Sequence, residues 1–285
     1  MDRQAVKPPF AYYGGKTTLG PKIAALLPKH DHYVEPFAGS LAVLLAKEPA
    51  TWETVNDLDD LLVNFWRVLR ERPAELAHVA MLTPHSRTEY AASCEDIAQV
   101  DDDLERARLV WVRITQGRKN TTRTGAASHW RYGQSASKGG HSWPSYLSAY
   151  AARMSEVAAR LKNVSIENRD AVDLIEEYGR HEDNCLYVDP PYVAASRVSL
   201  AQYRLEAADD DFHARLAAAL NDCKASVVLS GYDSTSYGDL YHGWYRVEMK
   251  APPSLGASER TEVLWSNRPI GEPDLFSTLD TEDTA

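Results

Sequence analysis

The chain has 285 residues, of which 44% are hydrophobic, and its formal net charge is −10. This composition allows a sizeable core, and a chain this acidic is not expected to coat nucleic acid indiscriminately. No stretch approaches the roughly 18 apolar residues of a membrane span, and the first residues lack a signal-peptide core, so we expect a cytoplasmic protein without membrane contact.

Cysteine and histidine usage argues against disulfide frameworks and metal centres. The three cysteines, Cys94, Cys185 and Cys223, lie far apart and form no Cys-x-x-Cys pair. The nine histidines show no metal-ligand spacing. We therefore expect reduced cysteines and no metal.

The amino-terminal part alternates predicted helices and strands. In chain order, we expect a helix over 19–27, a strand over 32–37, a helix over 41–46 and a strand over 52–55. The turn Gly39-Ser40 follows the first strand, and Asp57 follows the second. Nucleotide sites have this order, because the glycine turn permits close approach and the carboxylate accepts from a ribose diol.

The middle of the chain predicts helices without strands. Residues 58–98 have a helical pattern interrupted at Pro73 and Pro84, and further helices are expected over 104–115 and 146–161, with the loop 117–142 between them. We interpret 58–161 as a helical insertion.

One segment of this insertion is strongly basic. Residues 106–138 contain eight Lys and Arg side chains and no Asp or Glu, and Trp130 and Tyr132 stand among the cations. A solvated face normally mixes both signs of charge, so this pattern favours phosphate binding.

The strand pattern returns after the insertion. We expect strands over 164–167, 185–188, 226–230, 244–249 and 261–266, helices over 171–178 and 210–220, and a hairpin-like link between the last two strands. This order predicts an α/β fold with a doubly wound, mostly parallel sheet. Residues 271–285 are acidic and rich in Ser and Thr, which predicts a disordered tail.

The tetrapeptide Asp189-Pro190-Pro191-Tyr192 follows the predicted strand 185–188. Prolines favour extended backbone and donate no amide hydrogen, so this corner offers a carboxylate, bare carbonyl groups and an aromatic face. Two acceptors would localise the lone pair of a planar amine on its nitrogen, and Tyr192 could stack on the base. A rigid exit turn after a buried strand is the alternative.

These residues resemble the adenine-specific DNA methyltransferases whose cofactor motifs precede the catalytic motif, and phage or prophage members most of all. The resemblance runs from about Pro9 to Pro269. It rests on separated motifs in the right order, namely Ala11–Lys16, Val34–Ser40, Asn56-Asp57, Ile166–Asp170, Asp189–Tyr192, Ser230–Asp233 and Arg260–Trp265.

The resemblance implies a Rossmann-like methyltransferase sheet, with S-adenosylmethionine as methyl donor and an adenine of double-stranded DNA as target. It implies cofactor contacts at Tyr12, Lys16, Phe37, Gly39, Asp57, Asp170 and Asp189, and catalytic roles for Asp189, Pro190, Pro191 and Tyr192. Residues 1–57 and 162–270 would form the catalytic domain, and 58–161 would recognise DNA. Our candidates for DNA contacts are Arg118, Lys119, Arg123, Trp130 and Arg131.

Two residues have competing interpretations, and one departs from the family pattern. Asp57 could instead cap the following helix, and Phe37 could simply pack in the core. Leu41 stands where the family often has a small residue. The segment Trp130–Gly133 differs from the relatives that read a four-base palindrome, so their target is not carried over.

Three functions compete. The first is a site-specific adenine methyltransferase, the second methylates the exocyclic amine of cytosine, and the third is a decayed relative that only binds DNA. Relatives of the second kind more often have Ser before Pro-Pro-Tyr, so Asp189 favours adenine. Carbon-5 methylation usually needs a cysteine after a proline, which is absent here. We expect a monomer or weak dimer, and a restriction enzyme would be a natural companion.

Overall fold

The computed structural model describes residues 5–122, 129–132, 142–191, 210–250 and 261–270. Tyr192 and Arg123, two residues of the predicted site, lie outside the described residues, as does the acidic tail.

Within the described ranges, seven strands form one sheet in the order β3-β2-β1-β4-β5-β7-β6. The strands are β1 (His32–Glu35), β2 (Trp52–Asn56), β3 (Val164–Glu167), β4 (Asn184–Val188), β5 (Ser226–Tyr232), β6 (Tyr245–Lys250) and β7 (Thr261–Ser266). All neighbours from β3 to β5 are parallel, whereas β7 runs antiparallel to both β5 and β6. The predicted mostly parallel α/β sheet is confirmed, and β6 and β7 pair as expected.

Both faces of the central strands β1 and β4 are buried, as their apolar residues require. On one face, Val34, Leu186 and Val227 pack with helices α9 and α11. On the other, Tyr33, Tyr187 and Val228 belong to a core shared with the helices of the middle region. Neighbouring residues of one strand thus enter opposite cores, because strand side chains alternate between faces.

The described helices mostly follow the sequence expectation. They are α1 (Gly20–Leu26), α2 (Ala42–Ala46), α3 (Asp60–Glu71), α4 (Pro73–Leu82), α5 (Arg87–Ser93), η1 (Ile97–Gln99), α6 (Asp103–Gln116), α7 (Trp143–Ala151), α8 (Met154–Leu161), α9 (Ala171–Tyr178), α11 (Asp210–Asn221) and α12 (Thr235–Leu240). The single helix expected over 146–161 is wrong, because the chain breaks between α7 and α8. Helix α12 was not expected.

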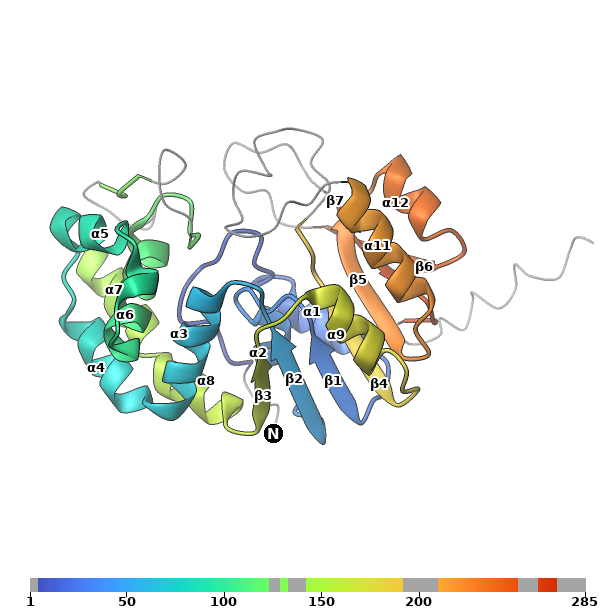
Figure 1. Cartoon of the computed structure of the whole chain (residues 1–285), viewed down its shortest axis with the longest axis horizontal. Coiled ribbons are helices and arrows are strands. Elements are labelled where there is room, and N and C mark those ends of the chain that lie inside the picture. Colours follow the sequence, from blue (N-terminus) through green and yellow to red (C-terminus); the bar gives the residue numbers. More distant parts are fainter. Residues whose placement is uncertain (1–4, 123–128, 133–141, 192–209, 251–260, 271–285) are drawn as a thin grey trace, which may run out of the picture.

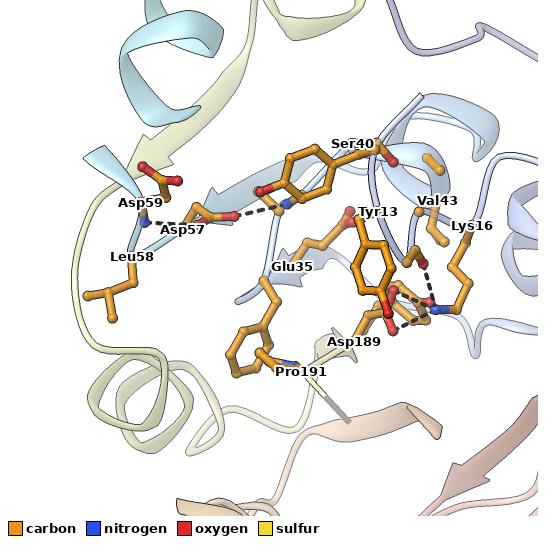
Figure 2. A pocket seen from close by; sticks show the side chains of 18 residues that line it. Tyr13, Lys16, Glu35, Ser40, Val43, Asp57, Leu58, Asp59, Asp189 and Pro191 are labelled. Carbon is orange, nitrogen blue, oxygen red and sulfur yellow. Dashed lines mark hydrogen bonds and ion pairs between the residues drawn. The ribbon is translucent and has the colours of Figure 1, made fainter. Parts of the chain in front are cut away.

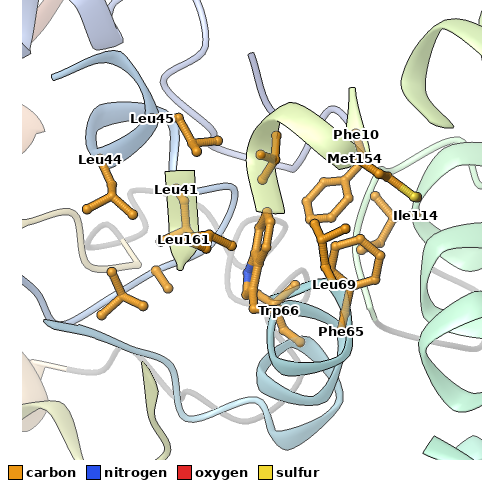
Figure 3. Packing of buried hydrophobic residues seen from close by; sticks show 14 of the residues in the cluster. Phe10, Leu41, Leu44, Leu45, Phe65, Trp66, Leu69, Ile114, Met154 and Leu161 are labelled. Carbon is orange, nitrogen blue, oxygen red and sulfur yellow. The ribbon is translucent and has the colours of Figure 1, made fainter. Parts of the chain in front are cut away.

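Helices α3 to α8 gather at the β3 end of the sheet (Figure 1). Their core is continuous with that of the sheet, because Phe65, Trp66 and Leu69 of α3 pack in one cluster with Leu41 and Leu161 (Figure 3). Trp111 of α6 also donates its indole hydrogen to the carbonyl of Pro9 at 3.1 Å. Shared core packing and this hydrogen bond therefore hold helices α3 to α8 against the sheet.

A group of buried charged side chains joins α2, β2 and α8. Glu53 of β2 accepts from Lys47, which follows α2, at 2.7 Å, and from Arg160 of α8 at 2.7 Å. Arg160 also donates to the carbonyl of Leu44 at 3.0 Å. Burial opposes ionisation of Glu53, but the hydrogen bonds from Arg160 and Lys47 outweigh it and hold its pKa below the ordinary value.

Candidate active site

The sheet reverses its winding between β1 and β4. From β1 the order runs outward through β2 and β3, whereas β4 leads the other way to β5. The two strands are parallel, so Glu35 and Val188 end at the same edge. In open α/β sheets, ligands bind outside the carboxyl ends of the strands at such a point.

A pocket that is open to solvent lies at this edge. It collects motifs that are far apart in the sequence (Figure 2). Its walls are drawn from the loop 12–16, the segment 35–43 from the end of β1 to the start of α2, residues 57–59 after β2, and residues 187–191 at the end of β4. Tyr12, Lys16, Phe37, Gly39, Asp57 and Asp189 all line it, as do Tyr13, Glu35 and Asp59, which the sequence analysis did not single out.

The turn after β1 has left-handed backbone at two positions. Gly39 has φ 46°, which glycine adopts without strain. A Cβ atom at Gly39 would also stand 3.5 Å from the Tyr12 ring, so the turn and the aromatic side chain fit closely. Leu41 also has a left-handed backbone, with φ 55°, which is strained for a residue other than glycine, and its side chain is fully buried.

Asp57 braces that turn. Its Oδ2 atom accepts from the backbone N–H of Gly39 at 3.0 Å, and its Oδ1 atom accepts from the N–H of Asp59 at 2.9 Å. The cap of α3 is Asp59, which accepts from the N–H of Leu61 at 3.1 Å. The alternative role of Asp57 as the helix cap is therefore wrong.

Lys16 and Asp189 form an ion pair in the pocket. The Nζ atom of Lys16 lies 2.8 and 2.9 Å from the two carboxylate oxygens of Asp189 and 3.0 Å from the carbonyl oxygen of Gly14. Glu262 of β7 lies 3.5 Å from the same Nζ atom. Lysine therefore fixes the orientation of the carboxylate at the strand tip. The sequence analysis did not predict that Glu262 would lie beside Lys16, although an acid in an apolar strand was a visible signal.

Asp189, Pro190 and Pro191 continue directly from β4, and Pro191 lines the pocket. A buried hydrogen bond links this strand to β5, because the hydroxyl groups of Tyr187 and Ser230 lie 2.9 Å apart in the core. The carboxylate of Asp189 thus projects from a rigid support.

Phe37 and Asp170 have different positions. Phe37 lines the pocket while being 8% exposed and packed edge-on against Phe212, so it takes part in both pocket and core. Asp170 is not among the residues that line the pocket. Its carboxylate caps α9 by accepting from the N–H of Val172 at 2.8 Å. The cofactor contact expected at Asp170 stays a prediction.

Glu35 is an unexpected acid in the pocket wall. It is 3% exposed, and its Oε2 atom accepts from the hydroxyl of Tyr33 at 3.0 Å. Burial, reinforced by the nearby Asp189 carboxylate, raises the pKa of Glu35 to about 8. A Glu in the apolar run His32–Glu35 is the sequence signal that could have identified it.

The predicted DNA-binding residues lie around a small aromatic stack. Trp130 and Trp143 stack on opposite sides of the His85 ring, with centroids 4.7 and 4.5 Å away. Arg118 is exposed and lies 4.9 Å from the ring of Tyr132, which is 65% exposed.

Several cations of the basic segment have internal partners. Arg131 donates to the side chain of Asn120 at 2.6 Å and to the carbonyl of Arg118 at 3.2 Å, which secures the loop. Arg113 is buried and donates to backbone carbonyls, while Arg108 pairs with Glu105 and Glu89. The basic sequence pattern therefore overstated the charge offered to a ligand, because acids elsewhere in the chain neutralise part of it.

The loop that follows α6 touches the pocket walls. The backbone N–H of Tyr13 donates to the carbonyl of Asn120 at 2.8 Å. The hydroxyl of Thr122 donates to Asp59, a residue of the pocket wall. The loop after α6, which leads toward the aromatic stack, is thus hydrogen-bonded to the pocket walls.

Within the described ranges, no three His, Cys, Asp or Glu side chains are grouped so that they could hold a metal ion. The helices in the described part of the chain are all too short or too polar to cross a membrane.

Comparisons with known proteins identify the family. Among solved structures, the chain is similar to one titled "Putative methyltransferase yhhF from Escherichia coli", with 12% identity, a TM-score of 0.34, and coverage of 89% of this chain and 82% of that one. A search of curated proteins gives no significant match. The model of the D12 class N6 adenine-specific DNA methyltransferase family matches residues 12–251, which is most of the sequence. The chain therefore belongs to the D12 class of N6 adenine-specific DNA methyltransferases.

Proposed function

We propose that the pocket binds S-adenosylmethionine and that Asp189 holds the exocyclic amine of an adenine taken out of the DNA duplex. One observation carries this proposal: the loop 12–16, the glycine turn, Asp57 and Asp189 meet in one pocket at the switch point of the sheet. A bound donor there would lie beside the Asp189 carboxylate, as transfer between two substrates requires.

The pocket walls suit the parts of this donor. The Asp57 carboxylate stands at the tip of β2, where an acid accepts from ribose hydroxyls, and its hydrogen bond to Gly39 keeps the turn open for close approach. Tyr12 and Phe37 offer aromatic surface, and Lys16 offers a cation. The donor, when bound, supplies a methyl group on a positively charged sulfur.

Asp189 then prepares the acceptor. Methyl transfer to nitrogen is an in-line displacement, in which the amine lone pair forms the new bond to carbon while the carbon–sulfur electrons leave with sulfur. The methylated amine then loses one of its two hydrogens as a proton to solvent. The Asp189 carboxylate and the carbonyl oxygen of Pro190 are suited to accept the two amine hydrogens, which would keep the lone pair on nitrogen. Lys16 would hold the carboxylate in register for this contact.

The adenine must leave the base stack to reach this strand tip, at a cost of a few kcal/mol. We propose that residues 58–161 recognise the DNA, while 1–57 and 162–270 form the catalytic domain. The exposed pair Arg118 and Tyr132 supports this division, because cations bind phosphate and aromatic rings stack on bases. Lys119, Trp130 and Arg131 stay candidates for the same surface.

Calorimetry tests the cofactor assignment. We expect S-adenosylmethionine to bind the protein in the presence of a chelator, and Asp57→Ala to weaken binding by about tenfold or more, because a charged hydrogen-bond acceptor is lost. Asp60→Ala is a matched control, since Asp60 is exposed on the first turn of α3 and lies outside the pocket. Absence of binding by the unaltered protein would refute the assignment, and equal binding by Asp57→Ala would remove Asp57 from it.

A further inference from the structure

Glu262 brings a second carboxyl group to the ion pair between Lys16 and Asp189. Strand β7 runs antiparallel to β5, and Glu262 pairs with Tyr232, the last residue of β5. The amino end of β7 therefore lies at the edge where the parallel strands end, which is also the edge of Asp189. A carboxylate oxygen of Glu262 lies 3.5 Å from the Nζ atom of Lys16.

Strand β7 gives no structural reason for a charge at this position. The next three residues of the strand, Val263, Leu264 and Trp265, belong to the buried core. Glu262 itself is only 8% exposed. A buried carboxylate is costly unless a cation or hydrogen-bond donors compensate it, and here the ion pair with Lys16 contributes to that compensation.

Lys16 is shared by the two acids. Its Nζ atom lies 2.8 and 2.9 Å from the oxygens of Asp189 and 3.0 Å from the carbonyl oxygen of Gly14, in addition to the contact with Glu262. Burial raises the pKa of the Tyr187 hydroxyl, and nearby carboxyl groups, including those of Asp189 and Glu262, raise it further. The two acids and Lys16 thus form one charged group at the end of β4.

A lysine this close to both oxygens of Asp189 has two opposing effects. It orients the carboxylate, but it also offsets the negative charge that the proposed contact with the amine requires. Methyl transfer moves positive charge onto the amine nitrogen, so a net negative charge at Asp189 stabilises the transition state. One cation and one carboxylate have no net charge, whereas one cation and two carboxylates keep a net negative charge.

We propose that Glu262 is a positioning residue for methyl transfer: it offsets the charge of Lys16, so that Lys16 orients Asp189 without neutralising it. This inference rests on the proposed function, because it requires Asp189 to hold the adenine amine. Glu262 acts through Lys16 and is not among the described residues that line the cofactor pocket. Its loss should therefore affect the methylation step more than the binding of the donor.

Two substitutions separate the charge of Glu262 from its packing. Glu262→Gln keeps the size of the side chain and can still accept a hydrogen bond from Lys16, but it removes the charge. Glu262→Asp keeps the charge but shortens the side chain. If Glu262 only packed at the end of the strand, glutamine would be the milder change. The proposal predicts the reverse order, with faster methylation by the aspartate variant.

The measurement is the single-turnover rate of adenine methylation by the full-length protein, with enzyme in excess over DNA and S-adenosylmethionine saturating. Glu262→Gln should lower this rate by about tenfold to a hundredfold, because an interaction with a charged group is lost. Calorimetry should give a dissociation constant for S-adenosylmethionine within about threefold of that of the unaltered protein, because the lost interaction acts in the transition state. Glu248→Gln is the matched control, since Glu248 is exposed on the neighbouring strand β6, and its rate should be unaltered.

A Lys16→Met background tests whether Glu262 acts through Lys16. That variant has no cation to offset, so adding Glu262→Gln should change its rate by less than about threefold. An equal cost of Glu262→Gln in both backgrounds would overturn the proposal.

The aspartate variant decides the outcome if Glu262→Gln does not fold or if Lys16→Met is too slow to measure. A rate of Glu262→Asp within about tenfold of the unaltered rate supports the proposal, and a larger loss overturns it. Methylation by Glu262→Gln at the unaltered rate, or faster than by Glu262→Asp, would overturn it as well. If the unaltered protein methylates no adenine, or if Asp189→Ala methylates as fast as the unaltered protein, the proposed function fails, and the inference fails with it.

Discussion

At the scale of single residues, Leu41 combines a strained backbone conformation with a buried apolar side chain. Its backbone is left-handed, with φ 55°, and its side chain is fully buried beside Leu44 and Leu161. A non-glycine residue in this conformation costs about 1–2 kcal/mol, whereas a buried leucine contributes several kcal/mol. Packing therefore outweighs strain at this position.

This balance predicts an unusual order of stability. Leu41→Ala and Leu41→Gly should each lower the free energy of unfolding by about 2–5 kcal/mol, but the glycine variant should be at least as stable as the alanine variant, because it relieves the strain. Urea unfolding measures both.

Leu44 provides the control, since it lies inside α2, where glycine should be about 1 kcal/mol worse than alanine. If the alanine variant were more stable than the glycine variant at both positions, the backbone of Leu41 would not be strained in solution.

At the scale of elements, the strands were predictable because apolar runs ended at glycine turns or acids, as at β1 and β2. The break between α7 and α8 was not, because the spacing of Leu147, Met154 and Leu161 stays helical across it, and all three are buried. Helix α12 is short and rich in polar residues, so its apolar pattern is weak. Its cap, Ser234, which accepts from the N–H of Tyr237, was the available signal.

The contact among α2, β2 and α8 depends on Glu53. Glu53→Gln would leave the buried cations Lys47 and Arg160 without their counter-charge, so we expect a loss of about 3–5 kcal/mol in the free energy of unfolding. Because the pKa of Glu53 is lower when folded, its contribution is present above the ordinary value of 4.5 and is lost as the pH falls through the folded value.

Urea unfolding at pH 7 and at acidic pH measures this contribution. Glu71→Gln is the matched control, because its pair with Arg70 is exposed and worth about 0–1 kcal/mol. Similar small losses of unfolding free energy in both variants would show that the buried charges around Glu53 do not stabilise the contact among α2, β2 and α8.

At the scale of the whole molecule, the sequence predicted which motifs form the pocket but not how they contact each other. Asp57 and Asp189 could be placed at strand tips because each directly follows a strand. The pairing of Lys16 with Asp189 joins residues 173 positions apart and depends on the strand order, which no local pattern contains. That Glu35 has no ion pair among the described residues depends equally on neighbours from other elements.

The hydrogen bond from Thr122 to Asp59 predicts coupling between DNA and cofactor binding. S-adenosylmethionine should raise DNA affinity, and Thr122→Val should reduce this effect by about fivefold, the worth of one ordinary hydrogen bond. Fluorescence anisotropy with labelled DNA, with and without the cofactor, measures the coupling. Thr88→Val, an exposed change on α5, should leave it unaltered. Undiminished coupling in Thr122→Val would exclude this route.

The most direct test of the central claim is the methylation rate of Asp189→Ala. DNA is incubated with the variant and saturating S-adenosylmethionine, and N6-methyladenine is counted by nucleoside mass spectrometry. We expect the rate to fall by about a hundredfold to a thousandfold or more while DNA binding persists, because in the proposed mechanism the carboxylate holds the amine and not the duplex. Asp183→Ala, an exposed change at the opposite end of β4, should keep full activity. Adenine methylation by Asp189→Ala at a near-normal rate would contradict the account.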